Sequence, residues 1–328
     1  MKPIKQFIDS SMTPFFLTLS PKKSETSISY SSQLFLMGSC FVENIGQKLA
    51  YHKLRTSINP FGIVFHPVAL ENLLQRIVEQ RKFNEDDIFY YNEQWHCFEV
   101  HSELSHSDQA HFLDTLNTQL KVSFEQLKQA THVVLTFGTA WGYIRKENEQ
   151  LVANCHKIPQ QHFNKQLSSV IDLESSFKRC FELIHQLNPK AQIITTISPV
   201  RHVKDGIIEN NRSKAHLLAA LHQSIESSAL FSYYPAYELV MDCLRDYRFY
   251  KADLVHPNDL AIEYIWEHFM HSYLHERDTQ KTLKQVGEIQ RGLDHKPFNS
   301  QSEAHRKFTT SLLKKMKSLK SDYPFISF

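Results

Sequence analysis

The sequence predicts an α/β protein with a mostly parallel β-sheet between two layers of helices, which is a three-layer α/β/α sandwich. Short, largely apolar runs occur at 34–37, 133–137 and 193–197, and the last two are rich in β-branched residues. Apolar residues at helical spacing follow them, for example at 41–49 and 173–187. Buried strands that alternate with helices are typical of a parallel sheet covered on both faces.

The first predicted strand, 34–37, ends at Gly38, a residue typical of tight turns. Apolar residues then recur every four positions over 41–49, and Ser39 or Cys40 stands where this helix would begin. Serine is a preferred helix N-cap. We therefore expect a strand, a tight turn and a helix in direct succession.

The other predicted strands also end at turn residues. The run 133–137 stops at Gly138, the run 193–197 stops at Ser198-Pro199, and a fourth strand is expected at 231–234. Further helices are expected at 68–80, 110–128, 173–187, 214–225 and 260–271.

One segment interrupts this alternation. Residues 88–91 and 95–100 are rich in aromatic residues and flank Asn92-Glu93-Gln94, a pattern that predicts a β-hairpin. It lies between two predicted helices. We therefore expect an insertion that lies over the working edge of the sheet.

The chain divides into three predicted parts. Residues 1–30 are polar and rich in serine, and we expect an extended N-terminal arm. Residues 31–277 form the α/β domain. Residues 278–328 are expected to form a polar linker followed by one amphipathic helix.

Composition restricts the partners of this protein. The formal net charge of the 328 residues is +2, which gives no overall electrostatic field for binding nucleic acid or an anionic membrane.

The sequence also indicates where the protein is located. No apolar run approaches the ~20 residues of a membrane span. Residues 1–9 lack the apolar core of a signal peptide. The 5 cysteines are widely spaced without a CxxC pair, as in reduced proteins. We expect a cytoplasmic protein, and the sequence does not predict its oligomeric state.

The candidate site lies where the predicted strands end, because open parallel sheets bind ligands at the carboxyl ends of their strands. Gly38-Ser39-Cys40, Gly138 and Arg201-His202 all follow strand ends. The simplest role of the two glycines is to make tight turns. Arg201 and His202 are candidates for gripping an anionic part of a substrate, or for a structural hydrogen-bond network.

Asp253 and His256 form a second candidate pair. A carboxylate three residues before a histidine can accept the Nδ1–H of the imidazole in a turn and leave Nε2 to take a proton. Pro257 favours an extended conformation at His256, just before the helix expected at 260–271. The simpler alternative is an ion pair at the start of that helix.

A metal site would use overlapping residues. Asp253, His256, His66, His156 and His202 offer oxygen and nitrogen ligands. No HExxH motif fixes a geometry, and no P-loop or GxGxxG motif is present. We therefore predict no metal and no cofactor.

Residues 35–41, Phe-Leu-Met-Gly-Ser-Cys-Phe, resemble the signature of the GSCFA family. Further matching segments lie at 59–62, 138–141, 153–157, 198–202 and 246–257, so the resemblance covers roughly residues 30 to 270. This family is similar to the SGNH/GDSL hydrolases, which cleave or transfer acyl groups on a three-layer α/β/α fold. The resemblance therefore implies an acyl hydrolase or acyltransferase.

The resemblance also implies roles for individual residues. Asp253 and His256 match the Asp-x-x-His block of those hydrolases directly. The first block is Gly-Asp-Ser, with the nucleophile third. A literal overlay gives Cys40 as the nucleophile, whereas a shift of one residue gives Ser39. A thiol at a helix N-terminus near a histidine would be favoured as the thiolate.

The implied oxyanion donors depart from the pattern. Gly62 matches the glycine of the second block, whose N–H would help to bind an oxyanion. The third block is Gly-x-Asn, which matches Gly138, but Ala140 stands where asparagine is expected. The resemblance then leaves Asn59 or Asn154 to supply the missing donor.

The sequence thus predicts an esterase or acyltransferase that acts on a small-molecule or acylated substrate. Ser39 or Cys40 would attack the carbonyl, His256 would act as base and then acid, and Asp253 would orient His256. The alternative is a non-catalytic module on the same fold that binds a small ligand or a partner protein.

Overall fold

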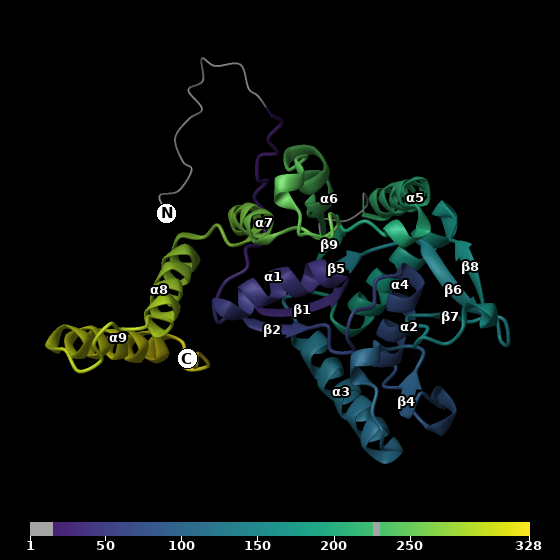
Figure 1. The fold of residues 1–328 in the computed structure, drawn as a ribbon, viewed down its shortest axis with the longest axis horizontal. Helices are drawn as coiled ribbons and strands as arrows, with labels where there is room; N and C mark the ends of the chain where they lie inside the picture. Colours follow the sequence, from purple (N-terminus) through teal and green to yellow (C-terminus); the bar gives the residue numbers. More distant parts are fainter. Residues whose placement is uncertain (1–15, 226–229) are drawn as a thin grey trace.

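The computed structural model describes residues 16–225 and 230–328 and confirms the predicted fold class (Figure 1). A central sheet has the strand order β10-β9-β5-β1-β2, and all neighbouring strands are parallel. Its strands are β1 (Gln33–Gly38), β2 (Arg55–Ile58), β5 (His132–Phe137), β9 (Gln192–Ile197) and β10 (Phe231–Tyr233). The chain leaves β1 toward β2 and returns to its other side at β5. This order places the topological switch point between β1 and β5, where ligands bind in open parallel sheets.

Successive side chains of each central strand point into different layers. In β1, Phe35 and Met37 pack into one apolar core, whereas Leu34 and Leu36 pack into the other. The strand is therefore buried on both faces, which explains its continuous apolar sequence.

Helices cover both faces of the sheet (Figure 1). One layer consists of α2 (Pro67–Val78), α3 (Gln109–Gln129), α4 (Val170–Leu187) and α5 (Ile207–Ile225). The other contains α1 (Cys40–Tyr51), α6 (Ala236–Glu238) and α7 (Asp259–Tyr273). Short helices occupy connections at η1 (Glu85–Asp87), η2 (Ser102–Leu104), η3 (Gln160–His162), η4 (Val203–Asp205), η5 (Leu239–Cys243) and η6 (Tyr247–Phe249). The three-layer sandwich is thus confirmed.

The predicted hairpin is present as β3 (Ile88–Tyr91) and β4 (Gln94–Cys97), but the expectation that it lies over the working edge was wrong. None of its strand residues lines the cleft at the strand ends. A second, unpredicted sheet with the order β7-β6-β8 lies there instead. Its strands are β6 (Trp141–Arg145), β7 (Leu151–Val152) and β8 (Phe163–Leu167). They have only two to five residues each, so their sequence is too short to show the periodicity that identifies a strand.

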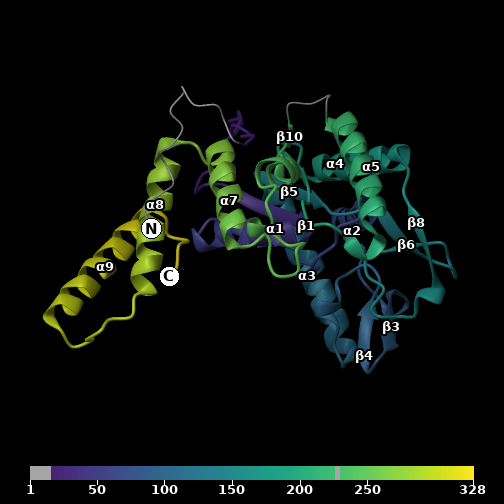
Figure 2. The same ribbon diagram turned by 45° about the horizontal axis from the view of Figure 1, so that its top comes forward.

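The C-terminal segment contains two helices where a linker and one helix were expected. They are α8 (Arg277–Leu293) and α9 (Glu303–Asp322), and Figure 2 shows α8 next to α7 and α9 next to α8. Leu283, Val286 and Ile289 of α8 are buried in the core that also contains α1 and α7. The Gln290 side chain donates a hydrogen bond to the Tyr51 carbonyl at 2.9 Å. Half of the predicted N-terminal arm, residues 1–15, lies outside the described residues.

No helix in 16–225 or 230–328 has both the length and the apolar character required to cross a membrane.

Candidate functional site

A cleft of about 950 Å³ lies at the carboxyl ends of the central strands. It is walled by the loops that follow β1, β5 and β9, by the second sheet and by the segment before α7. The structure brings together seven of the predicted site residues in its lining: Ser39, Cys40, Asn154, Arg201, His202, Asp253 and His256. Asn59, Gly62 and Gly138 do not line it.

The turn between β1 and α1 presents Ser39 and Cys40 to this cleft. Gly38 has φ +140°, and a Cβ atom there would lie 2.1 Å from the Thr136 carbonyl oxygen, so only glycine fits. The Ser39 hydroxyl accepts a hydrogen bond from the Phe41 N–H at 3.3 Å and caps the helix. Ser39 is 4% exposed, whereas Cys40, the first residue of α1, is half-buried. The Ser39 side chain therefore caps α1, and Cys40 is the more exposed of the two candidate nucleophiles.

Asp253 and His256 form the expected hydrogen-bonded pair. The Asp253 Oδ2 atom lies 2.7 Å from His256 Nδ1, and Oδ1 accepts the N–H groups of Val255 and His256 at 2.9 Å each. The N–H of His256, then that of Val255, then the imidazole lower the pKa of Asp253 to about 2. Asp253 is therefore a carboxylate at neutral pH, so the proton of this bond lies on His256 Nδ1. Nε2 is then the nitrogen that can accept a proton.

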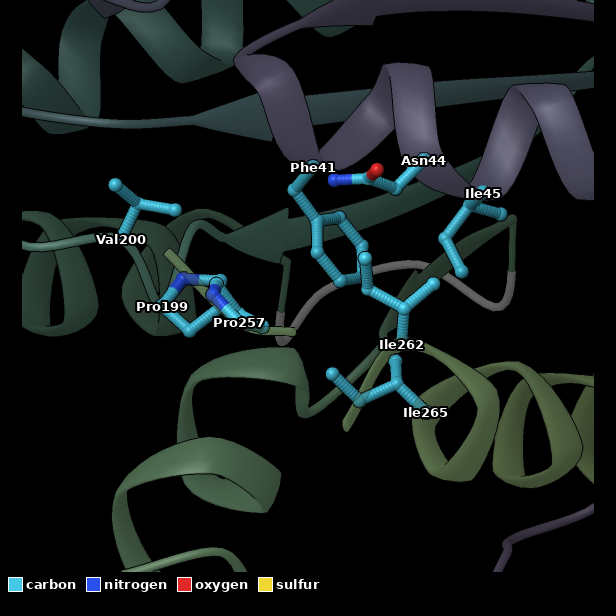
Figure 3. Close-up of a pocket in the computed structure, with 8 residues that line it drawn as sticks. All are labelled: Phe41, Asn44, Ile45, Pro199, Val200, Pro257, Ile262 and Ile265. Atoms are coloured by element: carbon cyan, nitrogen blue, oxygen red, sulfur yellow. The ribbon is translucent and has the colours of Figure 1, made fainter. Parts of the chain in front are cut away.

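The segment that carries His256 is packed against the helix that carries Cys40. Figure 3 shows Pro257 beside Pro199, facing Phe41 of α1 and Ile262 of α7. These apolar contacts enclose a space of only about 10 Å³. A hydrogen bond of 2.7 Å from the Lys251 N–H to the His256 carbonyl closes the same loop. The imidazole is thus held at the wall of the cleft that Cys40 also lines.

The expectation that the Cys40 thiolate is favoured was wrong. Burial, and then the carboxylate of Glu43, raise the pKa of Cys40 above its ordinary value. Lys214, the residue's own N–H and Lys251 act in the opposite direction but do not outweigh burial. Cys40 is therefore a neutral thiol at pH 7.

The predicted oxyanion donors outside the cleft have structural roles. The Gly62 N–H donates to the Asn59 carbonyl at 2.8 Å, and the Asn59 side chain accepts the Gly38 N–H at 2.9 Å. The Gly138 N–H donates to the Phe65 carbonyl at 2.8 Å. These N–H groups are therefore already used in holding the turns at the strand ends.

Asn154 is the predicted donor that the structure does place in the cleft. Its Oδ1 atom accepts the His156 N–H at 2.8 Å, which directs the amide. Within the described chain, Nδ2 makes no hydrogen bond to protein. This amide can therefore donate to a ligand.

Lys214 of α5 is a buried residue next to the cleft that the sequence did not lead us to expect. It is 1% exposed, and its ammonium group donates to the carbonyls of Gly138 at 2.5 Å and Ser198 at 2.7 Å. These residues directly follow β5 and β9. Burial lowers the pKa of Lys214 to about 7, against the opposing effect of Cys40. A usable signal existed, because Lys214 falls on the buried face of α5 that Leu217 continues at i+3.

The neighbouring Ser213 is hydrogen-bonded to the loop that follows β5. Its hydroxyl accepts the Ala140 N–H at 2.7 Å and is hydrogen-bonded to the Thr139 hydroxyl at 2.9 Å. Helix α5 therefore holds the loop after β5 through Ser213 and Lys214.

Two histidines of the cleft, His66 and His202, are neutral at pH 7. Burial lowers the pKa of His66 to about 4, and burial with the charge of Lys214 lowers that of His202 to about 4. His156, which was considered as a metal ligand, instead donates its Nε2–H to the Cys97 carbonyl at 2.7 Å and does not line the cleft. Across the described ranges, no three His, Cys, Asp or Glu side chains are grouped so that they could hold a metal ion.

Arg201 reaches the cleft from the loop after β9. Its guanidinium donates to the Tyr250 hydroxyl at 3.1 Å and to the Met241 sulfur at 3.0 Å, which are both neutral groups. Among the residues that the structure describes, no carboxylate is bonded to this guanidinium.

The fold and the site define an α/β protein with a thiol, a hydroxyl and an oriented imidazole at the switch point of a parallel sheet. Residues 33–269 match the GSCFA family, and residues 286–328 match the C-terminal domain of GSCFA domain proteins. The chain belongs to the GSCFA family. No curated protein matches it closely.

Proposed function

We propose that this protein is an acyl hydrolase or acyltransferase related to the SGNH/GDSL hydrolases, with Cys40 as the nucleophile. The observation that carries the proposal is the Asp253–His256 pair, whose loop packs against α1 and lines the same cleft as Cys40. A carboxylate that fixes the imidazole and leaves Nε2 for proton transfer is the arrangement that acyl-transfer enzymes use.

The chemistry follows from the protonation states. His256 Nε2 takes the proton from the Cys40 thiol as the sulfur attacks the carbonyl carbon of the substrate. The tetrahedral intermediate collapses, the bond to the leaving oxygen breaks, and His256 returns the proton to that oxygen. Water or another acceptor then attacks the thioester with His256 as base. The C–S bond breaks, and the proton returns to Cys40.

The oxyanion of the intermediate needs hydrogen-bond donors. We assign this role to the Asn154 amide and to the Cys40 N–H at the first turn of α1, where the helix leaves backbone donors unpaired. Loss of a single oxyanion donor lowers turnover by about 10²–10³-fold in other enzymes. We therefore expect Asn154→Ala to retain a measurable but much lower rate.

A short p-nitrophenyl ester tests the proposal. Cys40→Ala and His256→Ala should each lower kcat/KM by about 10³-fold or more, and the double variant should lose little more, because the two act as a unit. Ser39→Ala should cost about 1 kcal/mol of stability through the lost cap but retain most of the activity. Intact mass spectrometry should detect an acyl adduct that hydroxylamine removes.

The opposite pattern is equally informative. If Ser39→Ala abolishes turnover while Cys40→Ala does not, Ser39 is the nucleophile. If neither substitution affects turnover, the reaction takes place elsewhere.

A non-catalytic binding module is the second candidate function. Two observations favour it: Ala140 replaces an expected oxyanion donor, and burial raises the pKa of Cys40. Absence of turnover and of covalent labelling at both Ser39 and Cys40 would support this alternative.

A further inference from the structure

Two cations, Lys214 and Arg201, lie near the ends of β5 and β9, and neither is bonded to a carboxylate of residues 16–225 or 230–328. Lys214 is buried and bonded to two carbonyls, and Arg201 is bonded to a hydroxyl and a sulfur. Each lies within the electrostatic influence of the other, because Arg201 disfavours the charge on Lys214. Neither takes part in an ion pair with a described residue.

The proximity of these two cations is electrostatically unfavourable. A buried ammonium is normally paired with an acid, because its removal from water is costly. The two carbonyls satisfy two of its three N–H groups but carry no full negative charge. A second cation nearby raises the cost further, and an anion at this place would lower it.

The acids of the cleft do not supply that anion. Only Asp205 and Asp253 among its lining residues are acidic. Asp205 is paired with Lys165, and Asp253 with His256. The exposed lysines Lys157 and Lys204 line the cleft as well, so unmatched positive charge remains in it.

We propose that the cleft recognises an acyl compound that carries a second, anionic group of carboxylate or phosphate type, which the Arg201 guanidinium contacts directly. Arginine presents parallel N–H groups that match the two oxygens of such an anion. Lys214 is a positioning residue here, because it lies beneath the cleft and favours the anion through its charge. The choice of substrate rests on the proposed function, whereas the anion site itself does not.

Binding without turnover gives the first test. Succinate and inorganic phosphate, measured by calorimetry, should bind, and each should slow alkylation of Cys40 by iodoacetamide, followed by peptide mass spectrometry. Neutral succinamide should do neither. Preference for succinate or for phosphate then identifies the class of anion. If all three compounds behave alike, the proposal is overturned.

Turnover gives the second test. The mono-p-nitrophenyl ester of succinate should react faster than p-nitrophenyl acetate, and Arg201→Gln should reduce this preference at least about ten-fold. Arg201→Lys should restore part of it. Arg212→Gln removes the same charge from the exposed face of α5 and should leave the preference unchanged.

Lys214→Met extends the test to the buried cation. It should weaken the binding of succinate and lower kcat/KM for the succinate ester more than kcat/KM for p-nitrophenyl acetate. An equal loss toward the acetate and succinate esters would show a merely structural role for Lys214 and would overturn its part of the proposal.

Turnover of neutral esters without any anion effect would refute the inference and leave the proposed function intact. Anion binding without turnover of any ester would support the anion site and refute the proposed function.

Discussion

At the scale of single residues, Lys214 combines complete burial with a depressed pKa. Its pKa is about 7 in the folded protein against an ordinary value of 10.5. Between these values the unfolded chain binds more protons than the folded chain, so stability rises with pH. The folded protein bears the full cost of the charge below pH 7.

We therefore predict that the free energy of unfolding of the wild type, relative to Lys214→Met, increases by about 2 kcal/mol from pH 7 to pH 9. Urea titrations of both proteins across this range provide the measurement. Arg212→Gln, with its exposed side chain, serves as the control and should follow the wild type. A constant difference between wild type and Lys214→Met would mean that Lys214 titrates normally.

Asp253 gives a second prediction at this scale. Because its pKa is about 2, its carboxylate remains charged throughout the range in which the protein can be assayed. Asp253→Asn removes the acceptor that fixes the Nδ1–H tautomer of His256 and should lower kcat/KM for an ester by about 10²–10⁴-fold. Protonation of Asp253 should contribute nothing to a loss of activity between pH 4 and 7. Full activity of the variant would show that His256 does not need this partner.

At the scale of elements, the β1–α1 turn depends on one glycine. Gly38 has a positive φ, and its Cα faces the backbone of Thr136 on β5 so closely that a methyl group cannot fit. We predict that Gly38→Ala destabilises the protein by about 2–5 kcal/mol, from backbone strain and overpacking together.

Gly287 offers the matched control for this substitution. It lies within α8, and a Cβ atom there would approach only side-chain atoms at 3.3 Å or more. Gly287→Ala should be neutral or stabilise by up to about 1 kcal/mol through helix propensity. Thermal unfolding of the two variants distinguishes them, and equal effects would contradict the conformational role of Gly38.

At the scale of the whole molecule, the fold class could be predicted because the central strands are buried on both faces. Residues 133–137, for example, are buried throughout and apolar except for Thr136, and the glycine that follows marks the end of the strand. Helix α8 could not be predicted so easily. Most of its residues are polar. It becomes part of the core only because residues such as Val286 pack against the rest of the chain.

The candidate site was predictable only where short-range sequence determines it. The Asp253–His256 bond is formed within four residues, so its geometry could be inferred from spacing alone. Lys214 lies 76 residues from Gly138 in the chain, and only the packing of α5 onto β5 and β9 brings them together. Gly62 was a candidate through family pattern, but its N–H is used within its own turn.

The C-terminal helices give the last prediction, which concerns cooperativity. Val286 is fully buried in the same apolar core as Leu49 of α1 and Trp266 of α7, so α8 completes that core rather than standing apart from it. We predict one unfolding transition in calorimetry for the whole chain. Val286→Asp should lower the midpoint of that single transition strongly, because it buries a charge without a partner. Leu293→Asp, at a position on the same helix that is 46% exposed, should lower it little. Two separate transitions, with only the smaller one shifted by Val286→Asp, would instead show that residues 277–328 fold as an independent unit.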